Sequence, residues 1–165
     1  MQRWLFIKFR INVVRRASDM ELVQGLRFEE RAGSIVPILE NYSVSGALEP
    51  DGSWARSTDR HDDQHLLAIE GQSLVTFVKF RLEPGTYHLC YAFTAPGHRG
   101  RGLGSAVIEE FLSRAAASHP NFEVVTEIVS ENSEAVEAIL RKRGFRQAGS
   151  GWCLKLSDLA HGKAV

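Results

Sequence analysis

The chain has 165 residues, of which 20 are Lys or Arg and 20 are Asp or Glu, so its formal net charge at pH 7 is zero. This length suits one compact domain, expected to span residues 1–165. A neutral chain has no general attraction to nucleic acid or to an acidic membrane, so we expect neither as a partner. Any affinity for phosphate groups must then be local.

The two cysteines, Cys90 and Cys153, stand far apart in apolar runs and lack the spacing of a metal or redox pair. We expect buried, reduced thiols and therefore a cytoplasmic protein. The apolar start of the chain is interrupted by Lys8 and Arg10, and no small-residue cleavage site follows it. This pattern fits neither a signal peptide nor a membrane span.

The first third of the chain predicts a strand, a helix and a loop region. Residues 4–14 partly alternate apolar and polar and are rich in β-branched and aromatic types, which predicts a strand. A capping box formed by Ser18 and Glu21 predicts the start of a helix that ends near Gly33. The pattern weakens over 34–63, where we expect a variable loop region.

The rest of the chain predicts a meander followed by alternating helices and strands. Turn signals separate three apolar runs, over 65–70, 73–82 and 86–95, which predicts antiparallel strands. This order describes an α/β (α+β) fold with a mixed central sheet flanked by helices. The later predicted elements are a helix over about 102–118, a strand over 122–130, a helix over 132–144 and a closing hairpin over 145–156.

The segment PGHRGRGLGSAVI, residues 96–108, concentrates glycines directly before a predicted helix. Such a turn presents amide N–H groups at the helix N-terminus, which suits a pyrophosphate, and Arg99 and Arg101 add positive charge. A P-loop is excluded because no Lys lies between Lys79 and Lys142. A dinucleotide fingerprint does not fit, because the preceding strand belongs to a meander. The alternative is a plain strand-to-helix connection.

The run Arg99-Gly100-Arg101-Gly102-Leu103-Gly104 resembles the R/Q-x-x-G-x-G/A motif of the GCN5-related N-acetyltransferase (GNAT) superfamily. The predicted helix over 132–144 and the Gly144-Phe145 pair that closes it resemble the final helix of that family. The resemblance covers about residues 64–157, which would form the CoA-binding core. It implies a GNAT-like, mostly antiparallel central sheet.

The resemblance also implies acetyl-CoA as co-substrate, no metal, and a small-molecule or peptide amine that attacks the thioester directly in a ternary complex. The alternatives are a longer acyl donor, a non-catalytic acyl-CoA-binding or sensing module, and nucleic-acid binding through the arginines; a homodimer stays open. Backbone groups of the strand end and the loop would bind the cofactor. The residues implied are Phe93, Thr94, Ala95, Arg99, Gly100, Arg101, Gly102, Leu103, Gly104, Ser105 and Asn132.

The chain departs from the family where the proton donor is expected. A tyrosine that protonates the leaving thiolate in many members corresponds to Leu140 here, and the usual asparagine corresponds to Ser133, one residue after Asn132. Tyr91, Tyr87 or water would then protonate the thiolate. The alternative for both tyrosines is simple packing in the core.

Glu127 is the candidate general base, because desolvation within the apolar run VVTEIV would raise its pKa. The alternative is a structural carboxylate paired with an Arg at the sheet surface. The run DRHDDQH over 59–65 is rich in metal-ligand types, but sequential loop residues rarely close a tetrahedral site. We expect a solvated loop there, with substrate recognition and metal binding as the alternatives.

Overall fold

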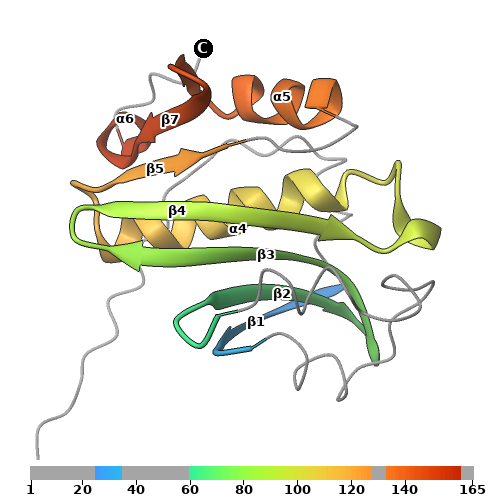
Figure 1. The fold of residues 1–165 in the computed structure, drawn as a ribbon. Helices are drawn as coiled ribbons and strands as arrows, with labels where there is room; N and C mark the ends of the chain where they lie inside the picture. The colour runs from blue at the N-terminus through green and yellow to red at the C-terminus, as the bar shows by residue number, and fades with distance from the viewer. Residues whose placement is uncertain (1–24, 35–59, 128–132, 161–165) are drawn as a thin grey trace, which may run out of the picture.

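The computed structural model describes residues 25–34, 60–127 and 133–160 (Figure 1). The strand predicted at 4–14, the start of the first predicted helix and most of the predicted loop region fall outside these ranges. The described elements are, in chain order, β1 (Leu26–Ala32), β2 (Gln64–Glu70), β3 (Ser73–Glu83), β4 (Thr86–Thr94), the 3-10 helix η1 (Pro96–His98), α4 (Leu103–Ser118), β5 (Glu123–Thr126), α5 (Ser133–Lys142), β6 (Arg146–Ala148), β7 (Gly151–Lys155) and α6 (Leu156–Ala160).

Within the described residues, seven strands form one sheet in the order β1-β2-β3-β4-β5-β7-β6. Strands β1 to β4 pair antiparallel as consecutive neighbours, and the pairing of β2, β3 and β4 confirms the predicted three-strand meander. Strand β5 pairs parallel to β4, and β7 lies between β5 and β6, antiparallel to both. The sheet is therefore mixed and mostly antiparallel, as predicted.

The helix predicted to end near Gly33 is wrong over Leu26–Ala32, where the structure has strand β1. In a strand conformation, this segment places alternate side chains on opposite faces of the sheet. Leu26 and Phe28 pack against the core, while Arg27 between them is exposed. Pairing with the buried strand β2 decides the conformation, since tertiary contacts override local helix propensity.

Helix α4 covers one face of the sheet and lies behind β4 in the view of Figure 1. The predicted apolar stripe of Leu103, Val107, Phe111 and Leu112 is buried. The Phe111 ring lies 4.8 Å from the Phe80 ring of β3, centroid to centroid. Burial of each large apolar side chain contributes roughly 1.5–3 kcal/mol, so this contact fixes the helix firmly on the sheet.

The C-terminal part follows the prediction of a helix and a hairpin. The Phe145 amide donates to the Leu140 carbonyl at 3.0 Å across Gly144, which closes α5. Two features differ from the prediction: β5 ends at Thr126, earlier than expected, and the short helix α6 follows β7. None of the helices in the described ranges has the length and hydrophobicity needed to span a bilayer.

Candidate active site

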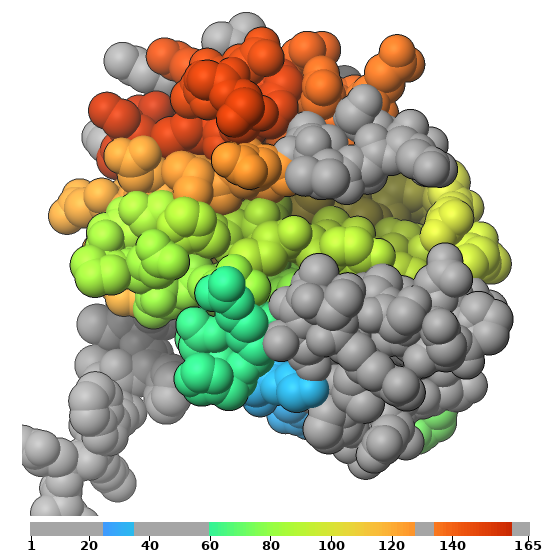
Figure 2. All heavy atoms as spheres, viewed as in Figure 1, coloured from blue at the N-terminus to red at the C-terminus, as the bar shows by residue number. Residues whose placement is uncertain are grey.

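Strands β4 and β5 separate partway along the sheet. Their register covers Thr86–His88 and Glu123–Val125, whereas β4 continues to Thr94 and β5 stays paired with β7. A bulge at Cys90, where the register with β3 shifts by one residue, bends β4 at this point. Figures 1 and 2 show the two strands in contact near the start of β4. Beyond the bulge, the edge of β4 has no strand partner on the β5 side among the described residues.

The backbone of β4 presents alternate residues to this open edge. The Ala95 amide donates to the Val75 carbonyl of β3 at 2.9 Å. Because backbone groups alternate along a strand, Phe93 and Ala95 face β3, whereas Ala92 and Thr94 face the open edge. Of the three strand residues expected to contact the cofactor through the backbone, Thr94 is therefore directed to the open edge, whereas Phe93 and Ala95 are directed to β3. Ala92, which was not among the three, also faces the open edge.

The glycine-rich loop leads from this edge into α4. Gly100 and Gly102 have φ of +76° and +77°, the left-handed region that favours glycine. The first hydrogen bond of the helix is donated by Ala106 to the Gly102 carbonyl at 3.0 Å. The amides of Leu103–Ser105 therefore precede the helical ladder, at the positive end of the macrodipole. Such a group of donors suits a phosphate.

Gly104 sets the distance between α4 and β4. A Cβ added to Gly104 would lie 3.2 Å from Oγ1 of Thr94, tighter than ordinary side-chain contact. The missing side chain therefore lets the first turn of α4 pack closely on the end of β4. Donors for a phosphate and a free strand edge thus meet at one place.

The two arginines of the loop form hydrogen bonds within the protein. Arg99 Nε donates to the Thr94 carbonyl at 3.1 Å. Arg101 pairs with the Glu70 carboxylate at 3.2 Å and donates to His98 Nδ1 at 2.8 Å. The hydrogen bond from Arg101 holds the pKa of Glu70 below its usual value. These contacts of the two side chains stabilise the conformation of the loop. Direct contact of either side chain with a phosphate stays a prediction.

A cavity of about 440 Å³ lies beside the point where β4 and β5 separate. Its lining includes Arg81 from β3, His88 and Cys90 from β4, Glu127 directly after β5, and Cys153 from β7. The strand residues among them alternate with core residues that pack against α4, so the cavity is on the opposite face of the sheet. Its volume is in the range of small-molecule sites.

The sequence profile described as "Acetyltransferase (GNAT) family" matches residues 34–145, more than half of the chain. The chain belongs to the GNAT family of acetyltransferases. The match contains the glycine-rich loop, α4 and the separated strands, so the resemblance carried by that loop is confirmed. A comparison with curated proteins finds no match.

Solved GNAT structures share the fold of this chain at low sequence identity. A GNAT-family protein from Desulfovibrio desulfuricans is 13% identical, with a TM-score of 0.58 over 79% of this chain and 99% of that one. The spermidine/spermine N-acetyltransferase SpeG from Vibrio cholerae is 12% identical, with a TM-score of 0.62 over 86% and 99%. The ribosomal-protein-S18-alanine N-acetyltransferase from Escherichia coli is 14% identical, with a TM-score of 0.57 over 78% and 89%. At these identities the likeness shows the GNAT fold alone.

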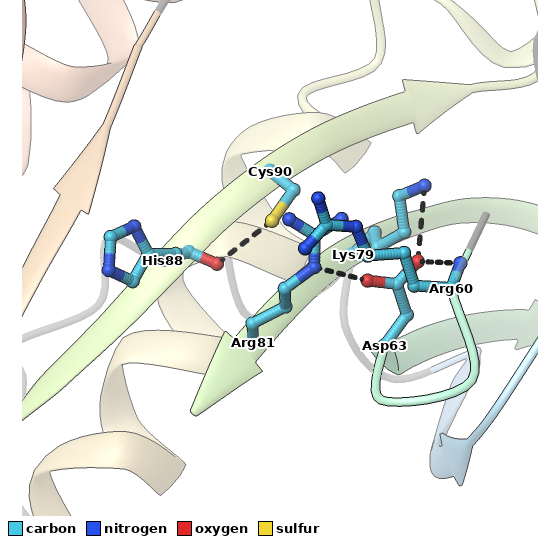
Figure 3. A network of polar contacts seen from close by, with 6 residues as sticks. All are labelled: Arg60, Asp63, Lys79, Arg81, His88 and Cys90. Carbon is cyan, nitrogen blue, oxygen red and sulfur yellow. Dashed lines mark hydrogen bonds and ion pairs between the residues drawn. The ribbon is translucent and has the colours of Figure 1, made fainter. Parts of the chain in front are cut away.

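Asp63 is fully buried directly before β2, so the solvated loop expected over 59–65 is wrong at this residue. Its carboxylate accepts hydrogen bonds from Arg81 Nε at 2.7 Å and from the Arg60 amide at 2.8 Å, and Lys79 Nζ lies 3.5 Å away (Figure 3). Burial by itself raises the pKa of this carboxyl group, but the hydrogen bonds and the two cations together hold it below its usual value.

Glu127 follows β5 and its side chain is exposed. The desolvation expected for it is therefore not found, because the strand ends one residue earlier, at Thr126. Glu127 forms no ion pair with any other described residue. Strand β7 lies against it, since a Cβ on Gly151 would be 3.4 Å from Glu127 Cγ. Its role as a base stays a prediction.

The two tyrosines considered as acids have different surroundings. Tyr87 is buried, and its hydroxyl is 2.7 Å from His119 Nδ1 while its ring packs edge-on against Phe111. Tyr91 is 37% exposed beyond the bulge, and its ring lies 6.1 Å from Phe77. Burial raises the pKa of both phenols, so each is a weaker acid than a free tyrosine. The position of Tyr87 in the core agrees with a structural role.

Replacing Tyr87 or Tyr91 by Phe is expected to change turnover by less than about tenfold, or roughly 1.4 kcal/mol. Tyr87→Phe should also lower the free energy of unfolding by about 0.5–1.5 kcal/mol, because the bond to His119 is lost. Thiol release and urea unfolding measure the two effects. A much larger loss of turnover in Tyr91→Phe, with stability retained, would identify Tyr91 as the acid.

Leu140 occupies the position of the tyrosine found in many GNAT members. It is 1% exposed and belongs to the hydrophobic core. It has no proton to donate and packs where solvent is excluded. Asn132 lies outside the described residues, and Ser133 is the first residue of α5. The proton donor therefore has to come from elsewhere.

Arg143 is a residue of this region that the sequence analysis missed. Its guanidinium donates to Ser105 Oγ at 2.8 Å and pairs with Glu109 at 2.8 Å. These contacts join the end of α5 to the first turns of α4. The sequence offers one signal, an Arg directly before the Gly144-Phe145 pair, but the partners are 38 and 34 positions away. Tertiary structure alone brings them together.

Proposed function

We propose that this protein is an acetyl-CoA-dependent N-acetyltransferase that transfers an acetyl group to a primary amine by direct attack in a ternary complex. The observation that carries the proposal is the close approach of Gly104 to the Thr94 side chain, which places the N-terminus of α4 on the end of β4, the strand whose edge is open. The residues present fit acetyl-CoA, since the helix end suits a pyrophosphate and the free strand edge suits amide groups. The substrates named for SpeG and for the ribosomal-protein enzyme are amines, which supports an amine acceptor.

The amides of Leu103–Ser105 would bind the pyrophosphate, with Arg143 fixing Ser105 in place. The backbone groups of Ala92 and the amide of Thr94 would bind the extended arm of the molecule, since the Thr94 carbonyl already accepts a hydrogen bond from Arg99 Nε. The four residue steps from Thr94 back to Cys90 span roughly 13 Å of strand. An arm that follows this edge therefore reaches the bulge, beside the cavity that would receive the amine.

Direct attack of the amine on the thioester is supported by the protonation state of the two thiols that line the cavity. Burial raises the pKa of Cys90 despite the nearby cations. Burial and the Glu123 carboxylate raise the pKa of Cys153 to about 11. Both thiols are therefore protonated at neutral pH, which disfavours an acyl-cysteine intermediate. The same thiols are free of disulfides, which fits the reducing cytoplasm in which we propose that the protein acts.

Glu127 is the carboxylate of the cavity lining, and it would accept a proton from the incoming ammonium, directly or through a water molecule. An amine attacks a thioester only when its nitrogen lone pair is free, so this proton must leave first. Because Glu127 is exposed, we expect its contribution to be at the lower end of general-base catalysis.

Glu127→Gln is expected to lower kcat/KM by about 10²-fold, because the amide keeps the shape of the side chain and removes the proton acceptor. The affinity for CoA should stay unchanged. The control Glu134→Gln alters an exposed carboxylate on α5 and should keep the wild-type kcat/KM. A wild-type kcat/KM in Glu127→Gln would remove Glu127 from the mechanism.

Titration calorimetry with CoA, acetyl-CoA and longer acyl-CoA thioesters tests the binding part of this proposal. We expect CoA and acetyl-CoA to bind at one site, with no gain in affinity for a long acyl chain. A strong preference for a long chain would support the alternative acyl donor. Absence of CoA binding would contradict the proposal.

A further inference from the structure

Arg81 lines the cavity beside the separated strands and is held there by a buried carboxylate. Its Nε donates to Asp63 Oδ1 at 2.7 Å, and Asp63 is fully buried. Figure 3 shows this pair from close by, with Cys90 alongside. Asp63 therefore cannot contact a molecule in the cavity, but it fixes the direction of Arg81. The Arg81 side chain itself is 21% exposed.

This arrangement keeps a positively charged fork on one wall of the cavity. The bond to Asp63 uses Nε, so the terminal part of the guanidinium retains the geometry that binds a carboxylate. Among the described residues, the exposed carboxylate of Asp62 also attracts the Arg81 guanidinium electrostatically, at longer range than Asp63 does. A group whose orientation is fixed before binding loses little freedom when a ligand arrives, which favours recognition at this point.

The opposite wall carries the opposite charge. Arg81 pairs with His88 in the β3–β4 register, and His88 pairs with Val125 of β5. Arg81 is thus two strand spacings, or roughly 10 Å of backbone separation, from the strand that ends just before Glu127. The cavity therefore has a guanidinium on the β3 side and a carboxylate at the end of β5, with a volume of about 440 Å³.

We propose that the acceptor is a small amine that also carries a carboxylate, such as a free amino acid, and that Arg81 binds this carboxylate while the amine faces Glu127. The proposal rests on the acetyltransferase function proposed above and names the substrate class of the same site. Arg81 then orients the acceptor and takes no part in proton transfer. A polyamine has no group for Arg81 and would place a cation against it, so the described charges disfavour that acceptor.

The test compares matched pairs of acceptors that differ in one group. Acetyl-CoA consumption by the full chain is measured with free amino acids, with the corresponding amino-acid amides, and with spermidine. We expect kcat/KM to be at least about tenfold higher for the amino acid than for its amide in the preferred pair. Equal or faster acetylation of the amide or of spermidine would overturn the proposal.

The Arg81 variants give a second measurement that does not depend on the amount of folded protein. Arg81→Gln should reduce the acid-to-amide ratio to nearly one through a higher KM, and Arg81→Lys should retain part of it while keeping a cation beside Asp63. The control Arg27→Gln, on the exposed face of β1, should keep the wild-type ratio. A wild-type ratio in both Arg81 variants would contradict the role of Arg81.

Binding measurements separate this proposal from the proposed function. If no amine is acetylated, calorimetry with amino acids and their amides in the presence of CoA still reports the ligand class. Tighter binding of the acid that is reduced in Arg81→Lys and lost in Arg81→Gln would support the carboxylate site even though the transferase function fails. Equal affinities for acid and amide, or binding of neither, would overturn it.

Discussion

Gly104→Val is expected to weaken CoA binding by about 10²- to 10⁴-fold, since it should remove two amide–phosphate hydrogen bonds of roughly 1.5–3 kcal/mol each. The Cβ at this position would already be 3.2 Å from Thr94 Oγ1, and the two methyl groups of Val need more room. The side chain would therefore push the first turn of α4 away from Thr94 and displace the amides of Leu103–Ser105. Titration calorimetry with CoA measures the loss.

A second glycine provides the control for this experiment. A Cβ on Gly25, before β1, meets no atom within 4 Å, so Gly25→Val should bind CoA like the wild type. Circular dichroism and a melting curve show whether each variant is folded. Wild-type affinity in a folded Gly104→Val variant would refute the assignment of the helix N-terminus as the phosphate site.

Asp63→Asn is expected to lower the free energy of unfolding by about 3–5 kcal/mol, because it removes the buried charge that Arg81 and Lys79 contact. The adjacent Asp62 is exposed, and Asp62→Asn should change stability by less than about 0.5 kcal/mol. Urea unfolding of the two variants compares neighbouring carboxylates that differ mainly in burial. A small loss in Asp63→Asn would show that the ion pairs add little to folding.

The stability difference between wild type and Asp63→Asn is expected to depend on pH. The pKa of Asp63 is lower in the folded chain than its ordinary value of 3.8. The stabilisation by this group is therefore fully present above that value and is lost as the pH falls through the folded pKa. The stability difference between wild type and Asp63→Asn should be constant from about pH 5 to 8 and should shrink below about pH 4. A difference that grows with acid would contradict the ion pairs.

The sequence predicts this fold well where the hydrophobic pattern and the turn signals agree. The meander from β2 to β4 and the helix α4 follow directly from alternating and helical periods closed by glycine and proline. The sequence predicts a helix over strand β1 because a capping box precedes it, whereas the observed conformation depends on pairing with β2. The early end of β5 is likewise decided by its neighbours, since Thr126 is the last residue paired with β7.

The parts of the candidate site also differ in how well the sequence predicts them. The loop from Arg99 to Gly104 was found from the sequence because the positive φ of Gly100 and Gly102 favours glycine, and such limits leave a local pattern. The contacts of Arg81 and Arg143 leave no local pattern, since their partners are distant in the sequence. Glu127 was found as a residue, but its exposure depends on where the strand ends. Sequence patterns therefore identify the cofactor loop more readily than the acceptor cavity.

Transfer of an acetyl group to an amine is the measurement that tests the proposed function most directly. The full chain would be incubated with acetyl-CoA labelled in the acetyl group and with a mixture of amino acids, amino-acid amides, polyamines and short peptides. Mass spectrometry would detect N-acetylated products while thiol release is followed. We predict a labelled N-acetyl product in equal amount to free CoA, and neither in Gly104→Val. Tight CoA binding without a labelled product from any amine would contradict the account and indicate a non-catalytic acyl-CoA-binding protein.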